Sequence, residues 1–149
     1  MKESTQQERE LPLALRAAYM ALHRNTEAAF SQHGVTADQF VLLLALSEGQ
    51  ALTQRELADR ISSDPSTVRA MLVLLEKMEL LQRASHPTDS RAKTVTLTAS
   101  GKRKLRKLWK AGQSIRDEMY GCMTPDEADT LIRQLRNITS TLNQENSLV

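Results

Sequence analysis

The chain has 149 residues, which is the usual length of one domain and is enough for a hydrophobic core. Apolar residues make up 40% and charged residues 26%, which argues against a disordered chain, and the aromatic content of 3% argues against stacking of single-stranded bases on aromatic side chains. The charge is unevenly spread: residues 52–110 hold 13 Lys and Arg against 6 Asp and Glu, whereas the remainder holds 7 against 12. A basic middle between acidic ends favours a polyanionic partner.

The sequence also argues against membrane, disulfide and metal proteins. The longest apolar run, residues 40–46, is too short to cross a bilayer, and the N-terminus lacks the apolar core of a signal peptide, so we expect a cytoplasmic protein. The single cysteine, Cys122, has no partner for an intramolecular disulfide. The three histidines, none with a neighbour at ligand spacing, are His23, His33 and His86. We therefore expect no metal and no cofactor.

Two helices are predicted before residue 50. The first covers residues 10–33, because apolar residues recur there near the helical period: Leu11, Leu15, Ala18, Leu22, Ala29 and Phe30. Gly34 is suited to end this helix in the left-handed conformation. Thr36 is the expected N-cap of the second helix, which runs to about Glu48 and is ended by Gly49. Because this second helix is apolar on nearly all sides, we expect it at the centre of the fold.

Two shorter helices follow, separated by a tight break. Thr53 and Glu56 form a capping-box pattern at the start of the third helix, whose expected inner face is Leu57, Ala58 and Ile61. Asp64 is the expected N-cap of the fourth helix, with Pro65 at its first position. The expected inner stripe of this helix is Val68, Leu72, Leu75 and Met78.

The periodicity then changes to two, which predicts a β-hairpin. Its strands are expected near residues 81–85 and 94–98, with a polar tip over residues 86–93. Thr98 is the expected cap of a fifth helix that reaches about Cys122, with that cysteine as a small core residue. Thr124 and Pro125 open a sixth helix that runs to about residue 144, with an apolar face of Leu131, Leu135, Ile138 and Leu142.

This order of elements predicts a mainly α fold with a small β-hairpin, a winged helix-turn-helix, in which the second helix of the motif enters the DNA major groove. The outer face of the fourth helix carries Ser66, Arg69, Ala70, Val73 and Lys77. Arg69 can donate two hydrogen bonds to guanine, and Thr67 or Val73 can contact a thymine methyl group. We also expect the positive N-terminus of this helix to attract phosphate. The alternative is an ordinary solvated face.

The hairpin tip carries Arg91 two residues after Asp89. The carboxylate can hold the guanidinium in one pose, and Arg83 at the strand end can pair with the same carboxylate. A fixed arginine at a protruding tip suits a narrow and strongly negative minor groove, and Lys93 is placed to meet the flanking phosphate. The alternative is a mobile, solvated loop. The basic start of the fifth helix, residues 102–110, is interpreted as a solvated face, some of whose members can approach phosphates.

Several segments together resemble the multiple-antibiotic-resistance regulator (MarR) family of bacterial transcription factors. They are Leu52-Thr53-Gln54-Arg55-Glu56-Leu57-Ala58, Asp64-Pro65-Ser66-Thr67-Val68, Leu75-Glu76-Lys77, Leu80-Leu81-Gln82-Arg83, Asp89-Ser90-Arg91-Ala92-Lys93 and Leu97-Thr98-Ala99-Ser100-Gly101. The Asp-x-Arg wing followed at this spacing by Leu-Thr-x-x-Gly is specific. The flanking helices also match in length and order, so the resemblance covers nearly the whole chain.

The resemblance implies a homodimeric repressor that binds a palindromic operator in double-stranded DNA. Residues 1–34 and 101–149 would intertwine with a partner, and residues 35–100 would bind DNA. Ser66, Thr67 and Arg69 would read the major groove, and Arg91, oriented by Asp89, would enter the minor groove. The whole predicted DNA-binding set is Thr53, Gln54, Ser66, Thr67, Arg69, Ala70, Val73, Arg83, Asp89, Ser90, Arg91 and Lys93.

The resemblance also implies a possible small-molecule effector, because many members of the family bind aromatic acids or drugs between the dimer helices and the winged motif. Residues of the first helix that could line such a cleft are Arg16, Tyr19, Met20, His23 and Arg24. Two cations and an aromatic ring can hold a carboxylate. The same residues can equally be dimer contacts.

One residue departs from the family pattern. The family usually has glycine between the recognition helix and the strand, where this chain has Glu79. A left-handed residue there would cost about 1 kcal/mol or more without glycine. We therefore expect the turn to take another conformation and to shift the wing slightly relative to the helix.

Two other function classes stay open. The winged motif can serve as a protein-interaction module without sequence-specific DNA binding, with its basic middle against an acidic surface. An enzyme is the third class, but the sequence shows no nucleophile–base pair, metal set or phosphate loop. Sequence-selective binding to DNA upstream of the chain's own gene would separate the first class from the second.

Overall fold

The computed structural model describes residues 2–48, 51–89 and 93–147, with backbone alone at 2–4 and 145–147. Of the residues named above, Gly49, Ser90, Arg91 and Ala92 lie outside the described residues. The chain divides into two compact units, Met1–Gly112 and Gln113–Val149. The predicted division at residues 34 and 100 concerns a dimer, and a single chain does not test it.

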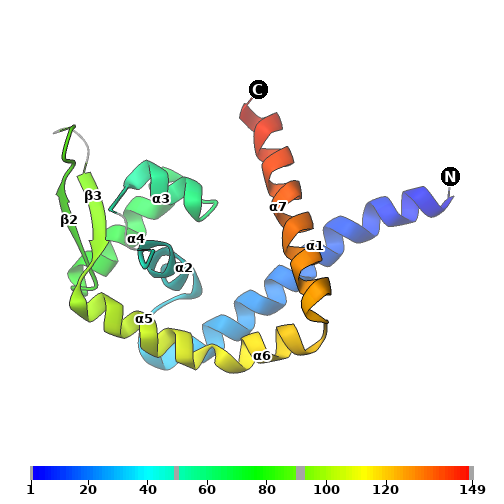
Figure 1. Cartoon of the computed structure of the whole chain (residues 1–149), viewed down its shortest axis with the longest axis horizontal. Coiled ribbons are helices and arrows are strands. Elements are labelled where there is room, and N and C mark those ends of the chain that lie inside the picture. Colours follow the sequence, from blue (N-terminus) through cyan, green and yellow to red (C-terminus); the bar gives the residue numbers. More distant parts are fainter. Residues whose placement is uncertain (1, 49–50, 90–92, 148–149) are drawn as a thin grey trace. The chain divides into compact units, whose positions relative to one another are not determined.

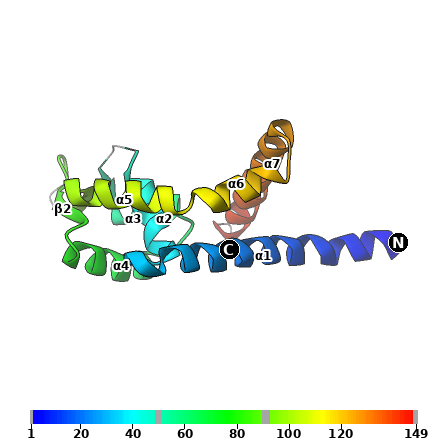
Figure 2. The same ribbon diagram turned by 90° about the horizontal axis from the view of Figure 1, so that it is seen from below.

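The order of elements confirms a mainly helical winged helix-turn-helix (Figure 1). The first unit contains α1 (Lys2–Phe30), the 3-10 turn η1 (Ser31–His33), α2 (Ala37–Leu46), β1 (Leu52–Thr53), α3 (Gln54–Arg60), α4 (Pro65–Lys77), β2 (Leu81–Ser85), β3 (Lys93–Leu97) and α5 (Ala99–Ala111). The second unit contains α6 (Gln113–Gly121) and α7 (Pro125–Ser147). Within the first unit, the hairpin and the N-terminus of α1 lie at opposite ends (Figures 1 and 2).

The sheet is antiparallel and has the strand order β1-β3-β2. Along the hairpin, Leu81 lies opposite Leu97 and Ser85 lies opposite Lys93. On the other side of β3, Leu52 of β1 pairs with Val95. The sequence did not predict β1, because two residues carry no readable alternation. This short strand ties the stem of the hairpin to the start of α3.

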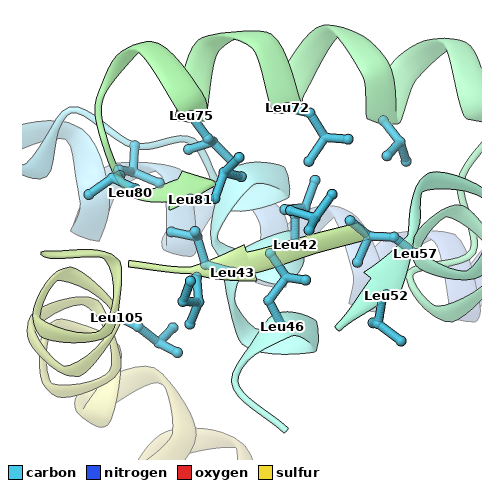
Figure 3. Packing of buried hydrophobic residues seen from close by; sticks show 14 of the residues in the cluster. Leu42, Leu43, Leu46, Leu52, Leu57, Leu72, Leu75, Leu80, Leu81 and Leu105 are labelled. Atoms are coloured by element: carbon cyan, nitrogen blue, oxygen red, sulfur yellow. The ribbon is translucent and has the colours of Figure 1, made fainter. Parts of the chain in front are cut away.

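The core of the first unit surrounds α2. Leu42 and Leu43 are fully buried, and Figure 3 shows leucines of α2, α3, α4, α5 and the sheet converging on them. Each such side chain contributes roughly 1.5–3 kcal/mol on burial. Val41 and Leu44, on the other side of α2, remain exposed in the single chain. The central position predicted for this helix is therefore confirmed for one of its faces.

Most predicted helix boundaries are confirmed, because they rest on local capping. Gly34 has φ 70° at the end of the first helical segment. Thr36 and Thr53 each form a capping box. Asp64 caps α4 with Pro65 at its first turn. Thr98 caps α5.

Four expectations about helices are wrong. The first helix begins at Lys2 rather than near residue 10, and Pro12 lies inside it on an exposed stretch. The predicted fifth helix is interrupted at Gly112, a glycine being a poor helix former, and Cys122 is exposed rather than in a core. Met78 is 40% exposed, while the other members of its predicted stripe are buried.

The turn after α4 also differs from expectation, because Glu79 keeps the left-handed conformation with φ 62°. The N–H of Glu79 donates to the carbonyl of Glu76 at 2.9 Å, and the N–H of Leu80 donates to the carbonyl of Leu75 at 3.1 Å. This pair of bonds is the Schellman motif, and both leucines are buried. The motif and its apolar contact hold Glu79 in place of the usual glycine.

The first turn of α5 packs directly on this turn. The hydroxyl of Thr98 donates to the carbonyl of Glu79 at 2.6 Å, and the Thr98 N–H donates to the carbonyl of Leu80 at 3.1 Å. Gly101 lies so close that a Cβ there would sit 1.9 Å from the Leu80 carbonyl oxygen. The glycine of the Leu-Thr-x-x-Gly segment is thus required for close approach of two backbones.

We predict that Glu79→Gly stabilises the protein by about 0.5–1 kcal/mol, because glycine carries little left-handed strain and loses only part of that gain through a more flexible unfolded chain. Urea denaturation followed by circular dichroism measures the change. Lys77→Gly, a matched change within α4, should destabilise by about 1 kcal/mol. Equal losses in both variants would contradict the strain at Glu79.

We predict that Gly101→Ala destabilises by at least about 2 kcal/mol, because a methyl group cannot fit against the Leu80 carbonyl without moving α5. The same denaturation experiment measures it. Ser100→Ala, one residue earlier in the same helix, should stay within about 0.5 kcal/mol of the parent protein. If Gly101→Ala leaves the free energy of unfolding unchanged, the close approach of Gly101 to the Leu80 carbonyl is wrong.

Candidate nucleic-acid interface

The two helices of the motif are joined by a second Schellman turn. Ser62 is left-handed with φ 53°, and the Ser63 N–H donates to the carbonyl of Ala58 at 2.8 Å. Across this turn, the side-chain amide of Gln54 donates to the carbonyl of Pro65 at 3.1 Å. The start of α3 is therefore tied directly to the start of α4. Gln54, predicted to contact DNA, uses one amide donor to position the next helix.

The N-terminus of α4 is occupied by a carboxylate. Asp64 accepts from the N–H of Thr67 at 2.8 Å and from its hydroxyl at 2.7 Å. These two bonds, the backbone one first, hold the pKa of the Asp64 carboxyl below its ordinary value of 3.8. The expectation that this helix end attracts phosphate is therefore modified: a fixed negative charge already fills it.

The outer face of α4 is open to solvent along its length. Its exposed members are Ser66, Thr67, Arg69, Ala70, Val73 and Lys77. None of the ion pairs among the described residues involves Arg69. The hydroxyl hydrogen of Thr67 is given to Asp64, so its methyl group and oxygen lone pairs are what it can offer a partner. The face has the length, exposure and donors that reading a major groove requires.

The hairpin is held against α4 by an ion pair that the sequence did not predict. Nε of Arg83 lies 3.2 Å from Oε2 of Glu76, without hydrogen-bond geometry. The Arg83 side chain is 24% exposed. Arg83 thus contacts a carboxylate on α4 rather than that of Asp89, which corrects the pairing considered for the wing. Its position suits alignment of the hairpin with the helix more than free contact with DNA.

The base of the wing tip is organised by His86. Its Nδ1 accepts from the N–H of Thr88 at 3.2 Å and from the N–H of Asp89 at 3.1 Å. The ring therefore closes the turn that leads to the tip, and Nδ1 carries no proton when it accepts these bonds. Asp89 is exposed at the end of this turn, and Lys93 is exposed at the start of β3. Ser90 and Arg91, the centre of the predicted minor-groove contact, lie outside the described residues.

The predicted effector residues follow one another along α1. Tyr19 and His23 have ring centroids 5.8 Å apart, and Tyr19 is 57% exposed. Arg16 and Arg24 are exposed, whereas Met20 is half-buried. A separate cavity of about 410 Å³ in the same unit is lined by other elements, α2, β3 and α5. The structure therefore brings the α1 residues onto one helix but not into that cavity.

Sequence reasoning missed three residues that shape this interface: Glu76, His86 and Ser62. The Glu76–Arg83 pair joins two elements through the tertiary fold and has no local signal. His86 did have a local sequence signal, because it is a side-chain acceptor followed by Pro87 and two turn residues. Such an acceptor can bond the backbone N–H groups two and three residues further on, as Asp and Asn do in turns. Ser62 lacks the glycine that usually marks a left-handed position.

The comparisons with known proteins agree with this geometry. The MarR family model matches residues 35–93, which include α2, both helices of the motif and the first strand of the hairpin. The HTH-type transcriptional repressor MdtR of Bacillus subtilis is 26% identical over 144 residues, 97% of this chain and 90% of that protein.

Two solved structures resemble the whole architecture. CouR, a transcriptional repressor solved with a 23-mer DNA duplex, has a TM-score of 0.79 at 25% identity, covering 90% of this chain and 95% of that one. BpsR of Bordetella bronchiseptica, whose DNA binding is regulated by 6-hydroxynicotinic acid, has a TM-score of 0.78 at 26% identity, covering 87% and 93%. Within the described part of this chain, no helix is long and apolar enough to cross a membrane.

We predict that Asp64→Ala lowers the melting temperature at neutral pH by several degrees, because α4 loses its N-cap. Because folding lowers the pKa of Asp64, its contribution is present above pH 3.8 and is lost as the pH falls through the lower folded-state value. The difference in melting temperature between parent and variant should therefore shrink below pH 3.8.

Asp64→Asn is the matched control, since asparagine caps helices as well as aspartate but does not titrate. Its advantage over Asp64→Ala should persist in acid. If the parent protein kept its full advantage in strong acid as well, the carboxylate would not be the stabilising group.

Proposed function

The chain belongs to the MarR family of transcriptional regulators, and from that premise we propose that it binds a palindromic DNA operator as a homodimeric repressor. The α4 face with Ser66, Thr67 and Arg69 enters the major groove. The wing, with Arg91 at its tip, enters the adjacent minor groove. The family consists of regulators rather than enzymes. Because its partner is DNA, we place the protein in the cytoplasm.

The observation that carries this proposal is the exposed face of α4 beside an aligned hairpin. Gln54 fixes the start of α4, and Glu76 holds the hairpin through Arg83. These two contacts come from opposite ends of α4, so helix and wing form one rigid surface. A helix and a hairpin held rigidly relative to one another suit neighbouring grooves of one DNA duplex better than they suit a deformable protein surface.

Uncovered apolar faces support the homodimer. Leu11 and Leu13 of α1 are 55% and 66% exposed, and Leu142 of α7 is 55% exposed. Val41 and Leu44 of α2 are also exposed. Long helices with such stripes at both ends of a chain require a partner to remove them from water. A second copy of this chain would supply matching apolar stripes, as in the homodimer that membership of the family implies.

An effector fits the same proposal. DNA binding by BpsR, one of the similar solved structures, is regulated by 6-hydroxynicotinic acid. In this chain the α1 residues Arg16, Tyr19 and His23 offer cations and aromatic faces along one helix. We propose that a small organic acid releases the repressor from DNA.

The test is fluorescence anisotropy with a duplex selected from random DNA, together with sedimentation of the free protein. We expect a dimer and an affinity that falls steeply with salt, because each neutralised phosphate releases counterions. Arg91→Ala should weaken operator binding at least about tenfold through loss of a groove contact. Arg133→Ala, an equal loss of charge on α7, should bind as the parent does.

Three results would contradict the proposal. If Arg91→Ala binds the operator with unchanged affinity at moderate salt, the wing does not contribute to the DNA interface. If the protein is a folded monomer at working concentrations, its helices do not pair with those of a second copy and the homodimer is excluded. Failure with every duplex would favour the protein-interaction module.

A further inference from the structure

The outer side of α5 carries a continuous group of cations. The helix has six Lys or Arg residues among its 13 and no acidic residue. No Asp or Glu occurs between Asp89 and Asp117. Five of the six cations are exposed and form what we call the α5 face: Lys102, Arg103, Arg106, Lys107 and Lys110. We propose that the α5 face binds the phosphate backbone of a second DNA duplex, so that the protein bridges two segments of DNA.

The helical period places all five cations on one side. Gly101, Leu105 and Leu108 are the buried residues of α5. At about 100° per residue, the five cations fall within an arc of about 140° on the side opposite this buried stripe. Along the helix axis they span about 12 Å, a length over which a duplex carries about seven phosphate charges on its two strands. The α5 face is therefore long enough to meet several phosphates of one duplex.

The charges of the α5 face are not neutralised by the protein itself. None of the five forms an ion pair with another residue that the structure describes. Like charges within about 10 Å of one another repel with little screening at 0.1 M salt. A polyanion that spans the face offsets this repulsion, and it releases its own counterions when it binds.

The α5 face is turned away from the outer face of α4. Figure 3 shows Leu72 of α4 and Leu105 of α5 entering the core from different sides, with leucines of α2 between them. Figure 2 shows α4 and α5 along opposite sides of the first unit. The wing tip is also distant, because the five residues of β3 separate it from α5 by roughly 16 Å. A straight duplex held by α4 and the wing therefore does not reach the α5 face.

The chemistry of the α5 face favours nucleic acid over protein. Protein interfaces have an apolar centre and are depleted in lysine, whereas three of these five residues are lysines with no apolar side chain among them. Trp109, which is 45% exposed, follows the buried stripe rather than the cations. The apolar stripe lies in the core, so α5 cannot insert it into a membrane. The choice of duplex DNA among polyanions rests on the proposed function.

A second copy of the chain does not cover this face. A twofold interface places the same patch of both subunits together, and five like charges cannot pair with themselves. The apolar side chains that support the proposed homodimer lie on α1, α2 and α7 instead. We therefore expect each dimer to present two α5 faces to solvent.

The test is a sandwich assay in which a surface-bound operator duplex, loaded with the protein, captures a second fluorescent duplex of unrelated sequence. We expect capture at about 50 mM salt and at least a hundredfold weaker capture at about 200 mM, because five phosphate contacts give a logarithmic salt slope of about −4.5. Arg106→Gln/Lys110→Gln should weaken capture at least about fivefold and reduce that slope by about two. Both side chains are exposed and glutamine is a good helix former, so the variant keeps the fold.

The matched control is Arg133→Gln/Arg136→Gln, the same loss of charge at exposed positions of α7. It should capture the second duplex as the parent does. No capture by the parent protein at low salt, or equal capture by Arg106→Gln/Lys110→Gln, would overturn the proposal.

Two further measurements exclude other partners for the α5 face. Anisotropy with the operator alone should show less than a twofold change in Arg106→Gln/Lys110→Gln. A loss of operator affinity as large as the loss of capture would make these cations contacts to the operator itself. Polyglutamate, added at equal charge, should displace the second duplex less well than unlabelled duplex does. Equal displacement would make the partner an acidic protein and overturn the proposal.

Anisotropy with duplexes of arbitrary sequence separates this proposal from the proposed function. If no duplex is bound selectively, but arbitrary duplex binds with a salt slope that falls in Arg106→Gln/Lys110→Gln, the α5 face stands and the regulator proposal fails. If an operator is bound but the sandwich captures nothing, the regulator proposal stands and the α5 face fails.

Discussion

The contact between the first turn of α5 and the turn after α4 determines the geometry of the whole candidate interface. Thr98 bonds both carbonyls of that turn, and Gly101 lets the two backbones touch. α4 ends immediately before this contact, and the hairpin begins immediately after it. The direction in which the hairpin leaves α4 is therefore fixed by directional hydrogen bonds to backbone carbonyls, one from the Thr98 hydroxyl and one from its N–H, rather than by side-chain packing alone.

Local chemistry explains which parts of the fold could be predicted from the sequence. The caps at Thr36, Thr53 and Asp64 were predictable, because a side chain there bonds an amide three residues away. Glu79 was not, because its left-handed conformation is held by the Schellman bonds together with the hydroxyl of Thr98, which comes from a distant segment. The propensity rule for left-handed residues gave the wrong expectation there, since it omits bonds that arise only after folding.

The candidate site was predictable in its exposed residues and unpredictable in its supports. Periodicity alone identifies the outer stripe of α4, since it is the complement of the buried one. The ion pair of Arg83 with Glu76 and the ring of His86 inside the wing turn depend on tertiary neighbours. α5 combines three roles in one helix: it docks on the turn, it contributes Leu105 and Leu108 to the core, and it presents a cationic surface.

The carboxylate of Asp64 has a consequence for how such a protein would search a genome. It accepts the amide N–H of Thr67 at the start of α4, so a phosphate group approaching that helix end would meet a negative charge. On arbitrary sequence this repulsion is not offset, and the encounter is brief. On the matching sequence, bonds to base edges outweigh it. Sequence selectivity would then come partly from faster dissociation from non-specific DNA.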